Sequence, residues 1–240
     1  FDMRWDIFCQ IVDNYGDAGV CWRLARALSR LSNTSNHDDI RIRLFCDDLS
    51  ILNTIAHGDA IGYGATLGIE VLPWSAAEST EVLNSIGDVV IEAFACHLPE
   101  SYVTAMTNRS VAPTWINLEY LTAETWADET HLMPSPQNNG LKKYFYFPGF
   151  TTKTGGVTLG DWDEVTLRDG QQPIPESLLK AGSQCRQDAK RISIFNYRHA
   201  PLDDWLRLLN QAASSCGDTA DVFICAGQNV SVAQLAPELT

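Results

Sequence analysis

The sequence predicts an α/β fold built on a parallel sheet, and two observations support this. Short runs rich in β-branched and aromatic residues alternate with helical or polar segments, as they do in βαβ units. Hydrophobic residues make up 45% of the 240 residues, which is ample for a buried core. In the first part of the chain, strands are expected at about 6–12, 40–46, 69–72, 88–94 and 114–118.

The turn after the first expected strand reads VDNYGDAG and carries two acids, Asp13 and Asp17. A local interpretation has Asp17 capping a helix at about 18–30 and Asp13 closing an Asx-turn. A functional interpretation notes that open α/β sheets bind ligands beyond the carboxyl ends of their strands. The residues alone leave both interpretations open.

The same turn contains Gly16 and Gly19, which are expected to let the backbone bend sharply. The start of the following helix would keep both carboxylates ionised. Two negative charges would repel a phosphate group, so the turn suits a cation or the acceptance of a proton. The G-x-x-G spacing matches neither the dinucleotide fingerprint nor the Walker motif, which disfavours a nicotinamide-dependent oxidoreductase.

Two further acidic turns follow expected strands. The string INLEYL places Glu119 and Tyr120 just past a strand, where Glu119 is either a site residue or a solvated loop acid. In CDDL, Asp47 and Asp48 precede a helical stretch, and helix capping is a sufficient explanation for them.

Composition excludes several classes of function. A net charge of -13 argues against nonspecific binding to nucleic acid or anionic membranes and favours a partner that presents cations. The seven cysteines form no C-x-x-C pair and are expected to be reduced core thiols, and no cluster has the spacing of metal ligands. No apolar stretch approaches the roughly 20 residues of a spanning helix, and no signal region is evident, so a soluble, cytoplasmic protein is expected.

A domain border is expected near 148–165, where the sequence becomes rich in glycine. Residues 1–150 would form the first domain, and 151–240 a linker and the start of a second α/β domain with strands at 191–197 and 221–227. These two strands are too few for a complete sheet, so either the chain is a fragment or they join the first sheet.

Phe195 and Tyr197 alternate in the first of these two expected strands and therefore point to one face. Core packing is the default interpretation of such a pair. Stacking on a nucleobase is the alternative.

The chain resembles the bacterial protein-arginine rhamnosyltransferases, the EarP family, which modify translation elongation factor P. The resemblance spans about residues 4–200 and is carried by WDIFCQIVDNYGDAGVCWRLARAL, LFCDDLSIL, DVVIEAFACHLPE, WINLEYLTAETW, HLMPSPQ, LKKYFYFPGFTTKTGGV and ISIFNYR. It implies a GT-B glycosyltransferase, in which two Rossmann-like domains face each other across a cleft, with the second domain incomplete in this chain.

The resemblance also implies an inverting transfer of L-rhamnose from dTDP-β-L-rhamnose to an arginine on the N-terminal domain of elongation factor P. No metal or other cofactor is expected. Asp17 would be the general base and Asp13 would orient the guanidinium, whose fork of N–H donors matches carboxylates. The remaining substrate-binding residues would be Asn14, Tyr15, Gly16, Gly19, Glu119, Phe195 and Tyr197.

The family's Arg-Gly-Glu-Asp-Ser motif, which helps to hold the nucleotide sugar, lies farther along its second domain than this sequence extends. If the natural protein ended at Thr240, a different class of function would be expected. The chain would then be a noncatalytic acidic module that binds an arginine-bearing protein partner.

Overall fold

The computed structural model describes residues 3–12, 15–34, 40–56, 58–157, 189–195, 200–217 and 219–225. The chain divides into two units, Phe1–Arg168 and Asp169–Thr240, and each is considered by itself. Much of the region expected to hold the domain border lies outside the described residues, so the position of that border stays a prediction.

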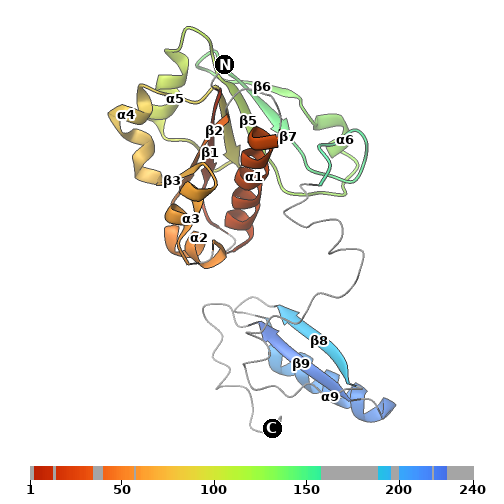
Figure 1. Ribbon diagram of the computed structural model, residues 1–240. Coiled ribbons are helices and arrows are strands. Elements are labelled where there is room, and N and C mark those ends of the chain that lie inside the picture. The colour runs from red at the N-terminus through yellow and green to blue at the C-terminus, as the bar shows by residue number, and fades with distance from the viewer. Residues whose placement is uncertain are drawn as a thin grey trace. The chain divides into compact units, whose positions relative to one another are not determined.

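The first unit is built on a seven-stranded sheet with the order β3-β2-β1-β4-β5-β7-β6 (Figure 1). Every neighbouring pair is parallel except β6 and β7, which confirms the predicted α/β class. The strands are β1 (Met3–Cys9), β2 (Ile40–Cys46), β3 (Ile69–Pro73), β4 (Val89–Ala93), β5 (Thr114–Leu118), β6 (Pro134–Pro136) and β7 (Lys142–Tyr146).

The first strand was predicted three residues too late. β1 pairs with β2 from Met3 to Cys9, and the chain leaves the ladder after Cys9 although Ile11 and Val12 are apolar. The Ile11 N–H donates a hydrogen bond to Asp47 Oδ1 instead, at 2.9 Å, and Val12 is exposed. Side-chain capture of one backbone donor therefore ends the strand, which hydrophobicity alone did not predict.

Helices cover both faces of this sheet. On one face lie α1 (Tyr15–Thr34), α2 (Leu49–Ile55) and α3 (Ala60–Thr66), and on the other lie η1 (Trp74–Glu78), α4 (Thr80–Leu83) and α5 (Glu100–Thr107). A short α6 (Ala127–Thr130) precedes β6. α1 starts earlier and ends later than the predicted helix at 18–30.

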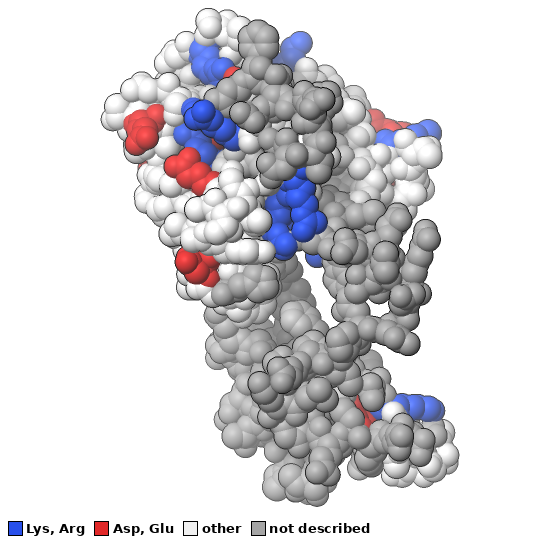
Figure 2. All heavy atoms as spheres, viewed as in Figure 1, with Lys and Arg blue, Asp and Glu red and all other residues white. Residues whose placement is uncertain are grey.

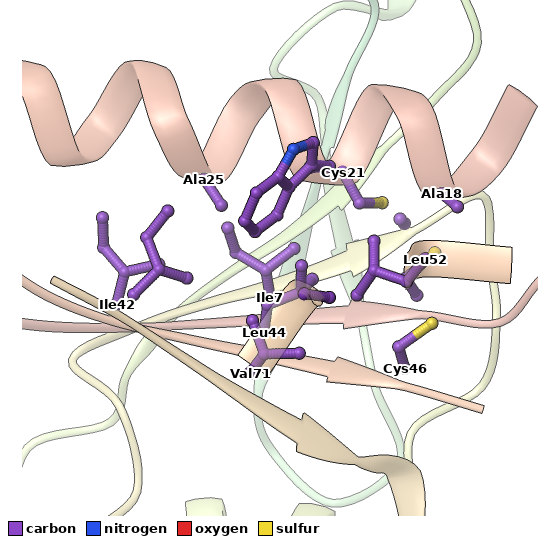
Figure 3. Close-up of a cluster of buried hydrophobic side chains, with 14 of the residues drawn as sticks. Ile7, Ala18, Cys21, Ala25, Ile42, Leu44, Cys46, Leu52 and Val71 are labelled. Atoms are coloured by element: carbon purple, nitrogen blue, oxygen red, sulfur yellow. The ribbon is translucent and has the colours of Figure 1, made fainter. Parts of the chain in front are cut away.

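The core beneath α1 follows from the alternation of side chains along the strands. Ile7 faces α1, whereas the next residue, Phe8, packs in the cluster on the opposite face of the sheet. Figure 3 shows Ala18, Cys21 and Ala25 of α1 above the strand residues of this core. Small side chains on the helix let it lie close to the sheet.

Four of the cysteines that the structure describes are buried free thiols, as predicted: Cys9, Cys21, Cys46 and Cys96. Hydrogen bonding with Cys21 raises the pKa of Cys9, and burial raises it further. Burial followed by the charge of Glu92 raises the pKa of Cys96 to about 12. The prediction of a core thiol is wrong for Cys216, which is exposed at the end of a helix in the second unit.

The described part of the second unit consists of β8 (Lys190–Phe195), α9 (Leu202–Cys216) and β9 (Ala220–Cys225). β8 and β9 pair in parallel as a separate two-stranded sheet. The described residues therefore give no support to the alternative that these strands join the first sheet. The expected ends of the two strands, at 197 and 227, lie outside the described residues.

A buried ion pair joins β1 and β2 and is linked through Tyr102 to α5, which covers one face of the sheet. Arg43 of β2 donates from Nε and Nη2 to the carboxylate of Asp6 in β1, at 2.7 and 2.6 Å. Asp6 also accepts hydrogen bonds from the Tyr102 hydroxyl and, at 2.8 Å, from the Gly87 N–H. A Cβ on Gly87 would stand 2.8 Å from Asp6 Cγ, so this close approach requires glycine.

Burial alone would lower the pKa of Arg43, but the hydrogen bonds and charge of Asp6 outweigh it and leave the pKa above its usual value. The two charges are therefore stable inside the protein only as a pair. We expect Arg43→Met to destabilise the first unit by about 3–5 kcal/mol, because Asp6 would remain as a buried unpaired charge.

Denaturant unfolding measures this loss, with Arg109→Met as the control. Arg109 pairs at 2.7 Å with Asp88, and the two side chains are 27% and 43% exposed. Arg109 also donates to the carbonyls of Ile86 and Gly87. Arg109→Met should cost only about 1–2 kcal/mol, because solvent screens the partly exposed pair and can reach the groups left behind. Equal losses in the two variants would contradict a special role for the buried pair.

The burial of the thiols can be tested by alkylation. At pH 8 we expect Cys216 to react quickly, and Cys9, Cys46 and Cys96 to react only after unfolding, because the thiolate is the reactive form and their raised pKa values suppress it. Mass spectrometry of peptides from briefly labelled protein distinguishes these sites. Rapid labelling of Cys9 in the native protein would contradict the structure.

Candidate active site

The carboxyl edge of the sheet brings together three loops from distant parts of the sequence. The chain runs from β1 toward β3 on one side and returns to place β4 on the other side of β1, so the strand order reverses between β1 and β4. Ligands of open α/β sheets bind at such a switch point, beyond the carboxyl ends of the strands. The loops after β1, β4 and β5 border this point.

Asp17 lies at this edge in the first turn of α1. Its side chain is fully buried, and both carboxylate oxygens accept hydrogen bonds: Oδ2 from the Val12 N–H and Oδ1 from the Tyr120 hydroxyl, each at 2.8 Å. Because α1 begins at Tyr15, Asp17 lies inside the helix and is not its cap. The capping interpretation of Asp17 is therefore wrong.

Tyr120 belongs to the loop after β5, and half of its surface is exposed. Its ring stacks on Phe94, from the loop after β4, with centroids 4.0 Å apart and an interplanar angle of 10°. Tyr120 therefore connects all three loops, because its hydroxyl bonds to Asp17 and its ring stacks on Phe94. Sequence reasoning placed Tyr120 at the ligand edge but assigned it no role.

The loop after β4 has an unusual backbone. Phe94, Ala95 and His97 have φ values of 55°, 51° and 56°, a region that residues with a Cβ rarely adopt. Hydrogen bonds hold this conformation: Phe94 N–H donates to Leu118 O at 2.7 Å, and Ala95 N–H donates to Asn117 Oδ1 at 3.1 Å. Backbone strain of this kind concentrates at functional sites.

A buried carboxylate anchors the far end of the same loop. Glu92 accepts the His97 N–H at 3.1 Å, the Trp115 indole N–H at 3.0 Å and the Lys143 ammonium at 3.1 Å. Lys143 also lies over the Trp115 ring, 4.8 Å from its centroid. Sequence reasoning missed Glu92, although an acid in the middle of the apolar run DVVIEAFAC was a usable signal.

Glu119 is half-buried at the same edge, next to Tyr120. Its carboxylate accepts a hydrogen bond from the Asn117 side chain, and its N–H donates to Tyr146 O at 2.9 Å. Asn117 therefore joins the loop after β4 to the loop after β5. These contacts hold Glu119 in place, so it is not a freely solvated loop acid, and its role in the site stays a prediction.

The other expected residues of the first turn have different outcomes. Tyr15 is half-buried and packs against the core beneath α1. Gly16 and Gly19 lie within α1, and neither has a positive φ, so the prediction that they bend the backbone sharply is wrong. The helix simply begins earlier than predicted. Asp13 and Asn14 lie outside the described residues.

The two acids after β2 have separate roles. Asp48 caps α2 as predicted and accepts the N–H groups of Ser50 and Ile51 at 2.9 and 3.2 Å. Hydrogen bonding from Ser50 is the main cause of its lowered pKa. Asp47 does not cap the helix, because its carboxylate holds Ile11 in the loop after β1.

Phe195 lies in the second unit, at the end of β8, and is 66% exposed. The default interpretation of Phe195 as a core residue is therefore wrong. Tyr197 lies outside the described residues, so the assignment of both aromatic residues to the donor pocket stays a prediction.

Within the described ranges, no group of three or more His, Cys, Asp or Glu side chains could hold a metal ion. No helix in those same ranges is long and apolar enough to cross a membrane. Among the coloured residues on the face drawn in Figure 2, basic and acidic side chains stand side by side.

The mostly parallel sheet and the acid at its switch point fit a Rossmann-like glycosyltransferase. Residues 5–236 match the family model described as elongation factor P (EF-P) rhamnosyltransferase EarP, and the chain belongs to this family.

Curated relatives named protein-arginine rhamnosyltransferase include those of Pseudomonas putida and Pseudomonas aeruginosa. The first is 44% identical over 88% of this chain and 55% of the relative, and the second is 39% identical over 87% and 54%. A Shewanella oneidensis relative is 42% identical over 74% of this chain and 44% of its own length. The chain thus spans about half the length of the curated relatives it matches.

Gly19 offers a test of the substrate side of α1. A Cβ at this position meets nothing within 4 Å, so Gly19→Ala should stabilise the helix by about 0.5–1 kcal/mol. If substrate occupies the open space, the same change should raise KM for the acceptor. Thermal unfolding and steady-state kinetics together check this, and greater stability with an unchanged KM would exclude Gly19 from the site.

Proposed function

We propose that this chain forms the acceptor-binding domain and part of the donor-binding domain of an inverting GT-B glycosyltransferase. The enzyme transfers L-rhamnose from dTDP-β-L-rhamnose to an arginine side chain of elongation factor P in the cytoplasm. It uses no metal and no cofactor beyond the nucleotide sugar. The observation that carries this proposal is Asp17, a buried, doubly hydrogen-bonded carboxylate at the switch point, in a family of rhamnosyltransferases.

The chemistry explains why acids stand where many α/β proteins bind phosphate. The acceptor guanidinium is positively charged at ordinary pH, and its planar fork of donors matches carboxylates. Asp13 and Glu119 supply carboxylates to bind and orient it. Asn14 and three residues at the start of α1, Tyr15, Gly16 and Gly19, complete the acceptor-binding side.

Transfer needs a nitrogen lone pair and the loss of one proton. As the nitrogen attacks the anomeric carbon, the bond from that carbon to the diphosphate oxygen breaks, and a carboxylate accepts the proton. We assign this role to Asp17. A single displacement from one face inverts the anomeric configuration. The donor is held by the second domain, where Phe195 and Tyr197 stack on the nucleobase.

Asp17→Asn in the full-length protein should reduce kcat by about 10²- to 10⁴-fold, because the amide keeps the shape of the side chain but cannot accept the proton. The assay follows rhamnose transfer to elongation factor P by mass spectrometry. Circular dichroism should show an unchanged fold.

Asp48→Asn is the matched control for this change. Asp48 lies at the same edge of the sheet, but it caps α2, and asparagine caps helices equally well. This variant should transfer at the wild-type rate. Wild-type transfer by Asp17→Asn would remove Asp17 from the mechanism, and absence of transfer by the wild-type protein would refute the proposed function itself.

A further inference from the structure

The carboxylate of Asp17 is closed to an incoming substrate. Its side chain has no exposed surface, Oδ2 is held by the Val12 N–H, and Oδ1 is held by the Tyr120 hydroxyl. A base that takes a proton from the acceptor must either be uncovered first or receive the proton through the group that covers it.

Tyr120 is placed to be that group. Its side chain reaches from the exposed surface to the buried carboxylate, since half of the residue is accessible while its hydroxyl lies 2.8 Å from Asp17 Oδ1. A phenol hydroxyl can donate one proton while its oxygen accepts another. Tyr120 thus has the two capacities that a proton relay requires.

The surroundings of Tyr120 favour transfer through the hydroxyl over movement of the ring. The ring stacks face to face on Phe94, and aromatic pairs of this kind add stability beyond their buried area. Phe94 is in turn fixed by its N–H bond to Leu118 O, in a loop anchored at its other end by Glu92. Swinging Tyr120 away would break the stack and the hydrogen bond together.

We infer that Tyr120 carries the proton from the acceptor nitrogen to Asp17, an inference that rests on the proposed function. As nitrogen bonds to the anomeric carbon and the bond to the diphosphate oxygen breaks, the nitrogen loses a proton to Tyr120 Oη. The hydroxyl proton of Tyr120 passes to Asp17 Oδ1 in the same step. Tyr120 ends the step unchanged, Asp17 ends it protonated, and the glycosylated guanidinium keeps its positive charge.

The test compares Tyr120→Phe with the wild-type full-length protein in single-turnover transfer from dTDP-β-L-rhamnose to elongation factor P. Phenylalanine keeps the stack on Phe94 and removes the hydroxyl alone. We expect the transfer rate to fall by about 10²-fold or more, with acceptor affinity by calorimetry within about threefold of wild type. Tyr144→Phe, on β7, is the matched control and should transfer at the wild-type rate.

Two further measurements separate a relay from simple positioning. In mixtures of light and heavy water, the wild-type rate should depend on the deuterium fraction along a curve, since two protons move in one step, whereas Tyr120→Phe should give a straight line. The double variant with Asp17→Asn should be no slower than Asp17→Asn alone, because both changes interrupt one path.

Several outcomes would overturn the relay. These are a Tyr120→Phe rate near or above that of the wild type, a straight-line isotope dependence in the wild type, or fully additive losses in the double variant. In each case wild-type transfer would still support the proposed function. Failure of the wild-type protein to transfer rhamnose would instead refute the function, whatever Tyr120 does.

Discussion

The hydrogen bond between Tyr120 and Asp17 joins residues 103 positions apart, and the candidate site depends on it. It connects the start of α1 to the loop after β5, while the stack on Phe94 adds the loop after β4. A single side chain thereby fixes three loops around the point where the strand order reverses. Its hydroxyl donates to a fully buried carboxylate, and a buried carboxylate is costly in a protein interior unless it accepts hydrogen bonds.

Buried charge recurs in this domain in two different roles. The Asp6 and Arg43 pair lies within the sheet and connects the central strands to α5 through Tyr102. Glu92, held by Lys143 and Trp115, lies nearer the carboxyl edge and holds a loop with strained backbone in place. The first arrangement supports the scaffold, and the second shapes the site that the scaffold presents. Each buried carboxylate has several donors, as a charge removed from water requires.

Much of the fold could be predicted because its signals are local. The strands at 40–46 and 114–118 were placed correctly, since β-branched and aromatic runs bounded by polar residues are legible in sequence. The end of β1 was misplaced because the side chain of Asp47 captures the Ile11 N–H, and such a contact has no periodicity that a sequence pattern can reveal. The Asp17 carboxylate holds the Val12 N–H of the same loop in the same way.

The sequence by itself determined the α/β class, the family of the chain and the presence of acids after successive strands, because these depend on residue type and local order. Only the tertiary structure decided that Asp17 contacts Tyr120, that Phe94 stacks on Tyr120, and that Glu92 anchors the loop after β4, which carries Phe94. The physical reason is that strand order is set by long-range packing of both sheet faces. Residues far apart in the chain become neighbours only after β4 has been placed beside β1.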